Sequence, residues 1–242
     1  MKDDTIERVR QETADWQYMR ELPDDWHGFQ LDRTVTVGKD MYIMYQYSND
    51  ALHKSAMVYF HEETNEYKVC LKVGLIEFCR IEFITPSLTV FEDFLRRQFE
   101  QVLLDMAVFN PKTLGSIVLD KGITTWESGA GLPEELEGFS LYIHPQEPVK
   151  INNGSYIIID YVDFSLESSF TVYYNIYRDE FFAEARIWNI PDVNYDFDSN
   201  ELTELEIKLR ERLRPRLQQV HNWAEQQAAT QQKQAEKETR NA

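Results

Sequence analysis

Carboxylate and amide side chains alternate with apolar ones in one short stretch near the C-terminal third of the chain. They occupy every second position, as Asp192, Asn194, Asp196 and Asp198. Oxygen ligands at this spacing open the calcium loop of an EF-hand. That loop also needs glycine at its sixth position and a bidentate glutamate at its twelfth, where this chain has Phe197 and Thr203. The alternation is instead typical of a strand with one solvated face, and we predict no metal here.

The residue types that most often bind metals or carry redox chemistry are scattered. The five histidines show no paired helical spacing and stand at His27, His53, His61, His144 and His221. The two cysteines, Cys70 and Cys79, have a separation that matches no zinc or redox motif, so we interpret them as reduced, half-buried thiols. The sequence therefore predicts no metal and no cofactor.

Two further patterns suggest catalysis only superficially. The segment 127–131, which contains Ser128, lacks the G-x-S-x-G order of a nucleophile elbow and the pattern of a Walker loop, so it predicts a flexible turn. Asp160 and Asp163 form a carboxylate pair, but nothing links them to a base or nucleophile. No catalytic residue is predicted, and we expect a protein that is not an enzyme.

Composition limits the classes of partner. The 242 residues are 43% hydrophobic and 13% aromatic, which favours a folded chain with a real core. A formal net charge of −17 repels phosphate backbones and anionic lipids, so we expect neither nucleic acid nor membrane as a partner, while a basic protein would be attracted. The chain shows no secretory signal and no apolar run long enough to span a bilayer, which predicts a cytoplasmic location.

An internal repeat dominates the sequence. Six residues recur at a separation of 110, as Trp16, Leu22, Pro23, Gly28, Phe29 and Leu31 against Trp126, Leu132, Pro133, Gly138, Phe139 and Leu141. After four extra residues in the second repeat the separation becomes 114, and it matches Tyr42-Ile43 with Tyr156-Ile157 and Leu88-Thr89 with Leu202-Thr203. The fold class predicted is α+β, a tandem duplication of an antiparallel β-meander followed by an amphipathic helix, with an approximate twofold axis.

The repeat sets the predicted organisation of the chain. We expect an N-terminal helix in 1–15, a first repeat in 16–107, a linker in 108–125, a second repeat in 126–221 and a polar tail in 222–242. Strands are predicted at 41–47, 56–62, 66–73 and 76–84, and at 155–162, 169–177, 181–188 and 190–197. The linker includes 115–119, which we interpret as one more short strand.

The two closing helices carry apolar stripes at spacings of three and four. The stripes are Leu88, Phe91, Leu95, Phe99, Leu103 and Met106, then Leu202, Leu205, Leu209, Leu213, Leu217 and Val220. Thr89 and Thr203 have capping-box spacing to glutamates, with Ser87 and Ser199 as rival caps. Pro215 predicts a kink or break near Arg214 and a less regular end to the second repeat. The tail has little to bury, so we predict it frayed or disordered.

Aromatic residues make the strands apolar on both faces. One face must take the helix of its own repeat, and the other needs cover from the second repeat, a second chain or a partner. The predicted partner-binding surface comprises Tyr45, Tyr47, Tyr59, Tyr173, Tyr174, Tyr177, Asp160 and Asp163. The leading hypothesis is a non-enzymatic module, of an inhibitor, immunity, anti-defence or chaperone-like kind, that binds a protein, with basic partners favoured. The alternatives are an enzyme or small-ligand protein with a pocket between the repeats, and a structural homodimer.

Overall fold

A computed structural model describes residues 1–152 and 154–241, with side-chain burial described up to residue 230. The chain divides into two compact units, Met1–Asn110 and Pro111–Ala242, at a point inside the segment that the sequence assigns to a linker. Each unit holds one seven-stranded antiparallel sheet followed by a helix. The predicted α+β fold with a duplicated meander is confirmed.

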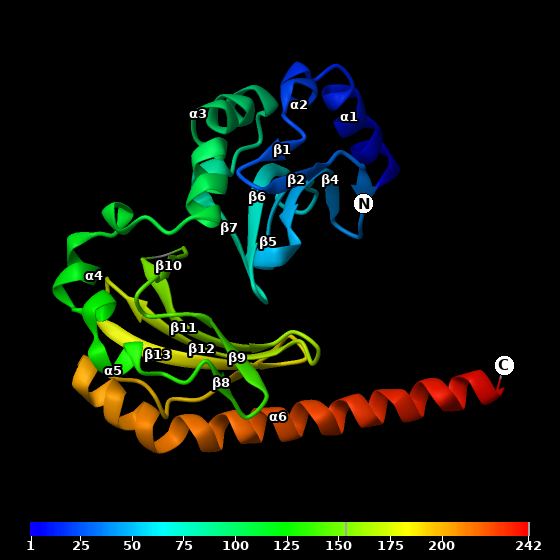
Figure 1. Cartoon of the computed structure of the whole chain (residues 1–242). Helices are drawn as coiled ribbons and strands as arrows, with labels where there is room; N and C mark the ends of the chain where they lie inside the picture. Colours follow the sequence, from blue (N-terminus) through cyan, green and yellow to red (C-terminus); the bar gives the residue numbers. More distant parts are fainter. Residues whose placement is uncertain (153, 242) are drawn as a thin grey trace. The chain divides into compact units, whose positions relative to one another are not determined.

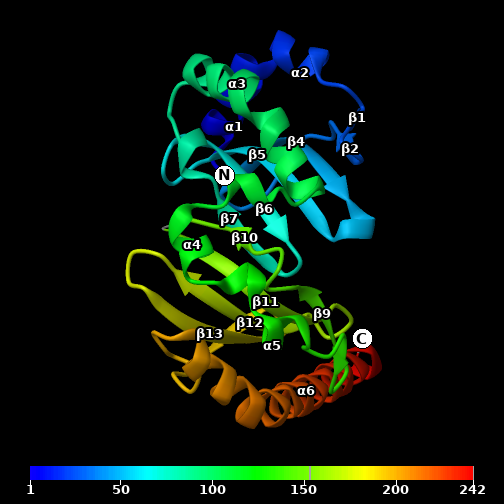
Figure 2. The ribbon, with the colours of Figure 1, turned by 60° about the vertical axis from the view of Figure 1, so that its left-hand side comes forward.

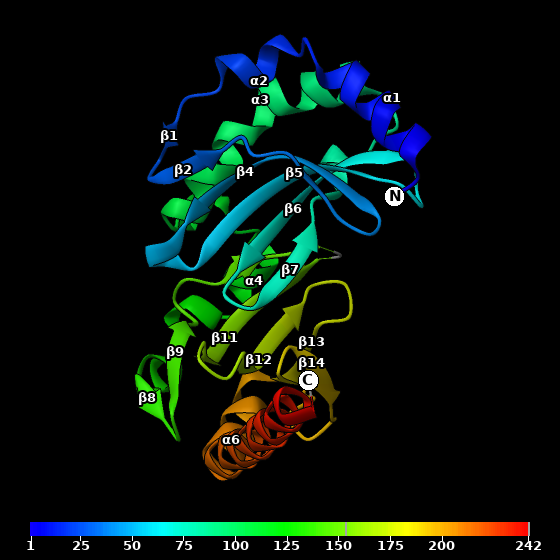
Figure 3. The ribbon, with the colours of Figure 1, turned by 90° about the vertical axis from the view of Figure 1, so that its right-hand side faces the viewer.

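The first unit begins with two helices and ends with a third. Its elements in chain order are α1 (Asp3–Thr13), α2 (Gln17–Glu21), β1 (Asp25–Trp26), β2 (Phe29–Asp32), β3 (Thr36–Val37), β4 (Met41–Asn49), η1 (Asp50–Leu52), β5 (Lys54–His61), β6 (Glu66–Val73), β7 (Ile76–Cys79), η2 (Ile81–Phe83) and α3 (Leu88–Ala107). The strand order is β1-β2-β4-β5-β6-β7, and β3 pairs with β4. All three helices lie on the same side of this sheet (Figure 3).

The second unit repeats this order. Its elements are η3 (Pro111–Thr113), α4 (Ser116–Asp120), η4 (Ile123–Thr125), α5 (Glu127–Ala130), β8 (Glu135–Leu136), β9 (Phe139–Ile143), β10 (Val149–Lys150), β11 (Ser155–Asp163), β12 (Ser168–Asn175), β13 (Glu180–Ile187), β14 (Ile190–Val193) and α6 (Leu202–Asn241). The strand order is β14-β13-β12-β11-β9-β8, and β10 pairs with β11. Figure 2 shows α6 running along one face of β11, β12 and β13.

The repeat extends to backbone irregularities that the sequence does not announce. The register of β4 against β5 shifts between Ile43 and Tyr45, and that of β11 against β12 shifts at the matching positions, between Ile157 and Ile159. Each unit also opens its sheet with a two-residue hairpin whose second turn residue, Gly28 or Gly138, has φ near +85°, with values of 83 and 87. A left-handed pair of residues matches the twist of the flanking strands, which explains the glycine at this turn.

Side-chain hydrogen bonds recur between the same positions in both units. The Trp16 indole Nε1 donates to Glu92 at 2.7 Å, and Trp126 Nε1 donates to Glu206 at 3.1 Å. These bonds tie the segment before the first hairpin to the closing helix. The glutamates that the sequence places in capping boxes therefore have another role, and in α3 it is Ser87 whose side chain accepts the Val90 N–H.

A buried tyrosine fixes each hairpin to its sheet. The Tyr47 hydroxyl donates to the Pro23 carbonyl at 2.6 Å, and the Tyr161 hydroxyl donates to the Pro133 carbonyl at 2.7 Å. Because a buried phenol needs a partner, this bond both satisfies the hydroxyl and holds the Leu-Pro turn in place.

The closing helices bury the stripes that the sequence predicts. Phe91, Leu95 and Phe99 of α3 are buried, as are Leu205, Leu209 and Leu217 of α6. Full burial of each such side chain contributes about 1.5–3 kcal/mol to folding, so these stripes supply much of each unit's core. No helix within the described residues is long and apolar enough to cross a bilayer.

The fourth strand of each repeat is shorter than predicted. It ends at Cys79 in β7 and at Val193 in β14, where the sequence suggests extension to 84 and 197. After β7 the chain turns through η2, which exposes Ile81 at 57% and buries Phe83. The apolar residues at every second position therefore stop sharing one face after Cys79, because side chains in a 3-10 turn repeat every three residues and not every two.

The end of the second repeat also corrects the prediction. The helix α6 is unbroken at Pro215, although its ribbon changes direction in the orange portion (Figure 1). Leu213 and Leu217 are buried on either side of the proline, and this packing compensates for the lost backbone hydrogen bond. Residues 222–241, expected to be frayed, continue the helix, and residue 242 lies outside the described residues. Residues 116–119, predicted as a strand, belong to the helix α4.

Candidate functional site

Three of the predicted surface tyrosines belong to the cores instead. Tyr45, Tyr47 and Tyr174 are each 0% exposed. The pattern of aromatic residues in the strands indicates two apolar faces but not which one meets the closing helix. These three side chains point to the helix-covered face, so they cannot form a partner-binding surface.

Two other predicted tyrosines lie on the opposite faces of their strands and are also buried. Tyr59 and Tyr173 occupy matching positions and are each 5% exposed. Tyr173 stacks on Phe182 with ring centroids 5.0 Å apart, while the Tyr59 hydroxyl lies 3.2 Å from the Cys79 sulfur. Burial raises the pKa of both phenols well above the usual value. Neither ring is presented for binding.

The two predicted aspartates do not act together. Asp160 is 0% exposed and accepts a hydrogen bond from the Thr171 hydroxyl at 2.7 Å. Asp163 caps a turn instead, since its Oδ1 accepts from the backbone N–H groups of Ser165 and Leu166 at 2.9 and 3.1 Å. Separated in this way, the two carboxylates form no acid–base pair.

The remaining predicted residue, Tyr177, is exposed at 79%. Its ring packs over Gly154, where an added Cβ would lie 2.5 Å from a ring carbon. Of the eight predicted residues, Tyr177 alone is an exposed aromatic side chain, so these eight do not form one aromatic surface.

The acidic stretch at 192–198 makes ordinary protein contacts. Asp192 pairs with Arg216 at 2.5 Å, and the Asp196 backbone carbonyl accepts from Arg212 at 3.1 Å. Within residues 1–152 and 154–230 no cluster of three or more histidine, cysteine or acidic side chains is arranged to hold a metal ion. The flexible turn predicted for 127–131 is wrong, because residues Glu127–Ala130 form the short helix α5, from which Ser128 hydrogen-bonds Glu206.

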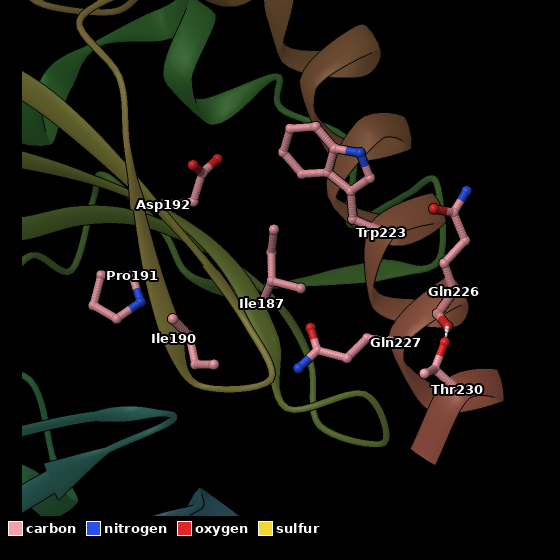
Figure 4. Close-up of a pocket in the computed structure, with 8 residues that line it drawn as sticks. All are labelled: Ile187, Ile190, Pro191, Asp192, Trp223, Gln226, Gln227 and Thr230. Atoms are coloured by element: carbon pink, nitrogen blue, oxygen red, sulfur yellow. Dashed lines mark hydrogen bonds between the residues drawn. The ribbon is translucent and has the colours of Figure 1, made fainter. Parts of the chain in front are cut away.

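An open groove lies between the edge strand β14 and the helix α6 in the second unit (Figure 4). This β14–α6 groove has a volume of about 540 Å³ and is lined by Ile187, Ile190, Pro191, Asp192, Trp223, Gln226, Gln227 and Thr230. The strand β14 and the last residue of β13 supply one wall, and three polar side chains of α6 continue the other wall beyond Trp223. Its volume is within the range typical of ligand and peptide sites.

The groove forms because α6 is longer than the matching helix α3 of the first unit. The helix α3 ends at Ala107, which matches His221, so everything in α6 from Asn222 onward has no equivalent in the first unit. Trp223 is held at the start of this extension by Arg216, whose guanidinium lies 5.9 Å from the indole centroid. Behind it, the Trp188 indole donates to the Ala224 carbonyl at 2.8 Å and fixes the helix to the β13–β14 turn.

Further exposed apolar side chains lie on β14, in the segment after it and on α6. Ile190 and Val193 are each 60% exposed, Tyr195 is 79% exposed and Trp223 is 39% exposed. The residue of the first unit that matches Ile190 is Ile76, which is only 4% exposed. We call these four side chains of the second unit the β14 strip.

The β14 edge is unsuited to pairing with a further strand. Pro191 lies opposite Arg186, one position from the hydrogen-bonded closing pair Ile187–Ile190, so its backbone nitrogen faces outward. Proline has no N–H to donate, and a proline at this place discourages strand addition. The groove and strip therefore offer side-chain contacts instead of an open ladder.

The two cysteines meet across the β6–β7 hairpin, which the sequence interpretation missed. Cys70 and Cys79 are direct partners in register, and the Arg80 N–H bonds the Val69 carbonyl, so the pair lies between ladder hydrogen bonds. In such pairs the Cα atoms are about 4.5 Å apart, at the short end of the disulfide range of about 4.4–6.8 Å. The signal was available, because both cysteines are equally distant from the Gly74-Leu75 turn.

The surroundings make these thiols unequal. A hydrogen bond from Cys70, helped by the Tyr59 hydroxyl and the nearby charge of Lys68, lowers the pKa of the Cys79 thiol. The same hydrogen bond raises the pKa of Cys70. These directions favour Cys79 as the thiol that attacks first.

We expect oxidised glutathione to convert this pair to a disulfide. The Cys79 thiolate attacks the glutathione disulfide and releases one glutathione thiolate; Cys70 then gives up its proton, attacks the Cys79 sulfur and releases the second. Intact mass spectrometry should show the loss of two hydrogens. Cys70→Ser should instead stop at a glutathione adduct on Cys79, and Cys79→Ser should stay largely unmodified. Equal adduct formation in the two variants would contradict the assignment.

Comparison with family models, with curated proteins and with solved structures finds no match for this chain. The fold and the surface thus define only a class, a duplicated α+β protein with an open groove in its second unit.

Proposed function

We propose that the chain is a cytoplasmic, non-enzymatic module that binds a protein partner through the β14–α6 groove and the β14 strip. The observation that carries this proposal is the exposure of Ile190 at a position where the matching Ile76 is buried. The second repeat exposes an apolar residue that the first repeat buries, and its longer helix lies beside that residue. An exposed apolar surface of this kind is suited to a protein partner.

The chemistry of the partner follows from the groove and the net charge. Trp223, Ile187 and Ile190 favour an apolar anchor side chain, and Trp is among the residues that contribute most at protein interfaces. The glutamines and Thr230 on the α6 wall offer hydrogen bonds at the rim. Acidic side chains outnumber basic ones in both units, so the field of the whole chain favours a basic partner.

Affinity capture from cell extract with matched variants tests the proposal. Ile190→Ser and Trp223→Ser should each lose the specific partner, weakening its binding by tenfold or more, because an apolar anchor in an interface contributes about 2 kcal/mol or more. Val90→Ser and Ile207→Ser are the controls, since these side chains are 43% and 46% exposed and lie outside the groove. With the captured partner in hand, association should slow as salt rises above about 0.15 M.

Two results would contradict the proposal. If the groove variants and the controls capture the same proteins, the groove is not the binding surface. If light scattering shows a dimer of the wild type that Ile190→Ser converts to a monomer, the groove joins two copies of this chain and the structural homodimer is correct.

A further inference from the structure

A second pocket lies in the second unit, between α5, the β8–β9 hairpin and α6, and it is separate from the β14–α6 groove. Its volume is about 410 Å³. Six of its lining residues carry the argument, namely Trp126, Ser128, Leu136, Glu206, Arg210 and Leu213. We call it the Trp126–Arg210 pocket.

The first unit shows what fills the same place there. The matching residue of Ser128 is Tyr18, whose ring lies 5.5 Å from the Trp16 ring and 4.9 Å from the Arg96 guanidinium. Tyr18 is 4% exposed, so it occupies this place fully. The position is a receptor for an aromatic ring, and in the first unit the chain supplies that ring itself.

Three differences between the repeats remove aromatic side chains from the corresponding position in the second unit. Tyr18, Trp26 and Phe99 correspond to Ser128, Leu136 and Leu213, each a smaller side chain. The floor and one wall are retained, because Trp126 still donates its indole N–H to Glu206. The pocket is therefore the space that three aromatic side chains fill in the first repeat.

The arginine at the rim has lost its partners in the same way. Arg96 bonds Glu92 at 2.8 Å and Glu21 at 3.0 Å, and these carboxylates raise the pKa of its guanidinium. The residue that matches Glu21 is Gly131, which has no side chain. In the part of the chain with described side chains, no hydrogen bond or ion pair holds the Arg210 guanidinium, and Arg210 is exposed. The Trp126 hydrogen bond lowers the pKa of Glu206 most, and the charge of Arg210 contributes less.

We propose that the Trp126–Arg210 pocket binds a ligand that joins an aromatic ring to a carboxylate, replacing what Tyr18 and Glu21 provide in the first unit. The ring stacks beside Trp126 and under the Arg210 guanidinium, and the carboxylate pairs with that guanidinium. A free aryl-alkyl carboxylic acid and a partner helix with an aromatic residue three positions before a glutamate share this chemistry, since Tyr18 and Glu21 lie on one helix, α2.

A nitrogen–proton NMR titration of the full chain tests the proposal, with 3-(4-hydroxyphenyl)propionate as the probe. The Trp126 indole N–H signal, assigned with Trp126→Phe, should shift and saturate. The matching amide, 3-(4-hydroxyphenyl)propionamide, should bind at least tenfold more weakly, because it lacks the charge that pairs with Arg210. A peptide with the sequence of residues 16–22 is the second arm, and the tighter of the two probes identifies the source of the ligand.

Variants separate this site from general binding. Ser128→Tyr restores the side chain of the first repeat and should fill the pocket, and Arg210→Gln removes the cation, so each should weaken the acid tenfold or more. Arg212→Gln is the control, because Arg212 lies on the same helix but pairs with Asp196 outside the pocket. Both test positions are exposed, and an unchanged spectrum elsewhere verifies folding. No saturable shift at Trp126, equal binding of acid and amide, or unaltered affinity in Ser128→Tyr would overturn the proposal.

Discussion

Replacing Leu217 with alanine should lower the free energy of unfolding by about 2–5 kcal/mol, the usual cost of truncating a buried leucine. Leu217 is 0% exposed and belongs to the core that α6 forms with the second sheet. The change removes apolar contacts and leaves a cavity that the helix cannot fill without leaving the sheet. Urea unfolding, followed by tryptophan fluorescence, should show a lower midpoint with an unchanged slope.

The repeat supplies a matched test for this prediction. Leu103 of α3 occupies the same position and is also 0% exposed, so Leu103→Ala should cost a similar amount. Ile207→Ala, at a half-exposed position of α6, should stay within about 0.5 kcal/mol of the wild type. A Leu217→Ala variant as stable as Ile207→Ala would mean that α6 does not pack on its sheet as described.

The repeat is the reason that so much of the fold is predictable from one sequence. Matching letters at fixed separations fix which elements correspond, and the helix stripes and strand runs give their types. Side-chain contacts that the sequence alone does not reveal also recur at matching positions of the two units. The Tyr47 bond to the Pro23 carbonyl and the Tyr161 bond to the Pro133 carbonyl are one contact written twice.

The sequence does not determine which face of a strand packs against the closing helix. A strand such as β4 carries aromatic residues on both faces, and the register shift between Ile43 and Tyr45 changes which of them face the helix. The sequence pattern therefore predicts a surface position for Tyr45, which is a core residue. The length of α6 was not predicted for a different reason. Composition shows that residues 222–241 have little to bury, but it does not show that the Ala224 carbonyl accepts a hydrogen bond from the Trp188 indole.

The β14–α6 groove and the Trp126–Arg210 pocket lie where the two repeats differ. Matching letters reveal shared structure, whereas the groove and the pocket arise where matched positions differ, as Tyr18 does from Ser128. Aligned positions that change from a large aromatic residue to a small one are a usable sequence signal for a pocket. The exposure of Ile190 has no such signal, because isoleucine stands at both matched positions.

Asp160→Asn should raise the stability of the chain by about 2–4 kcal/mol above pH 7 and leave it nearly unchanged near pH 4. The Asp160 carboxyl is fully buried, and burial raises its pKa from 3.8 to about 7, against the opposing effects of the Thr171 hydrogen bond and the Arg186 charge. Its second oxygen, Oδ2, has no hydrogen-bond partner within the described residues. Such a site favours the neutral acid.

The sign follows from comparing the two states. Between pH 4 and 7 the unfolded chain has released this proton while the folded chain keeps it, so protons bind the folded state more and stability falls as pH rises. Above pH 7 the carboxylate is charged in both states and the folded chain bears the full cost of burying it. An asparagine has no proton to release, so its unfolding midpoint should vary less with pH across this window.

Thr171→Val distinguishes the buried charge from general disruption of the strand pair. The threonine is 0% exposed and its hydroxyl donates to Asp160, so the valine variant keeps the shape and removes the hydrogen bond. Because a charged carboxylate loses more than a neutral acid when a donor is removed, the variant should be destabilised most above pH 7. Urea midpoints measured from pH 4 to 9 decide the matter, and a wild type and an Asp160→Asn variant with parallel pH profiles would show that the folded carboxyl titrates as it does in the unfolded chain.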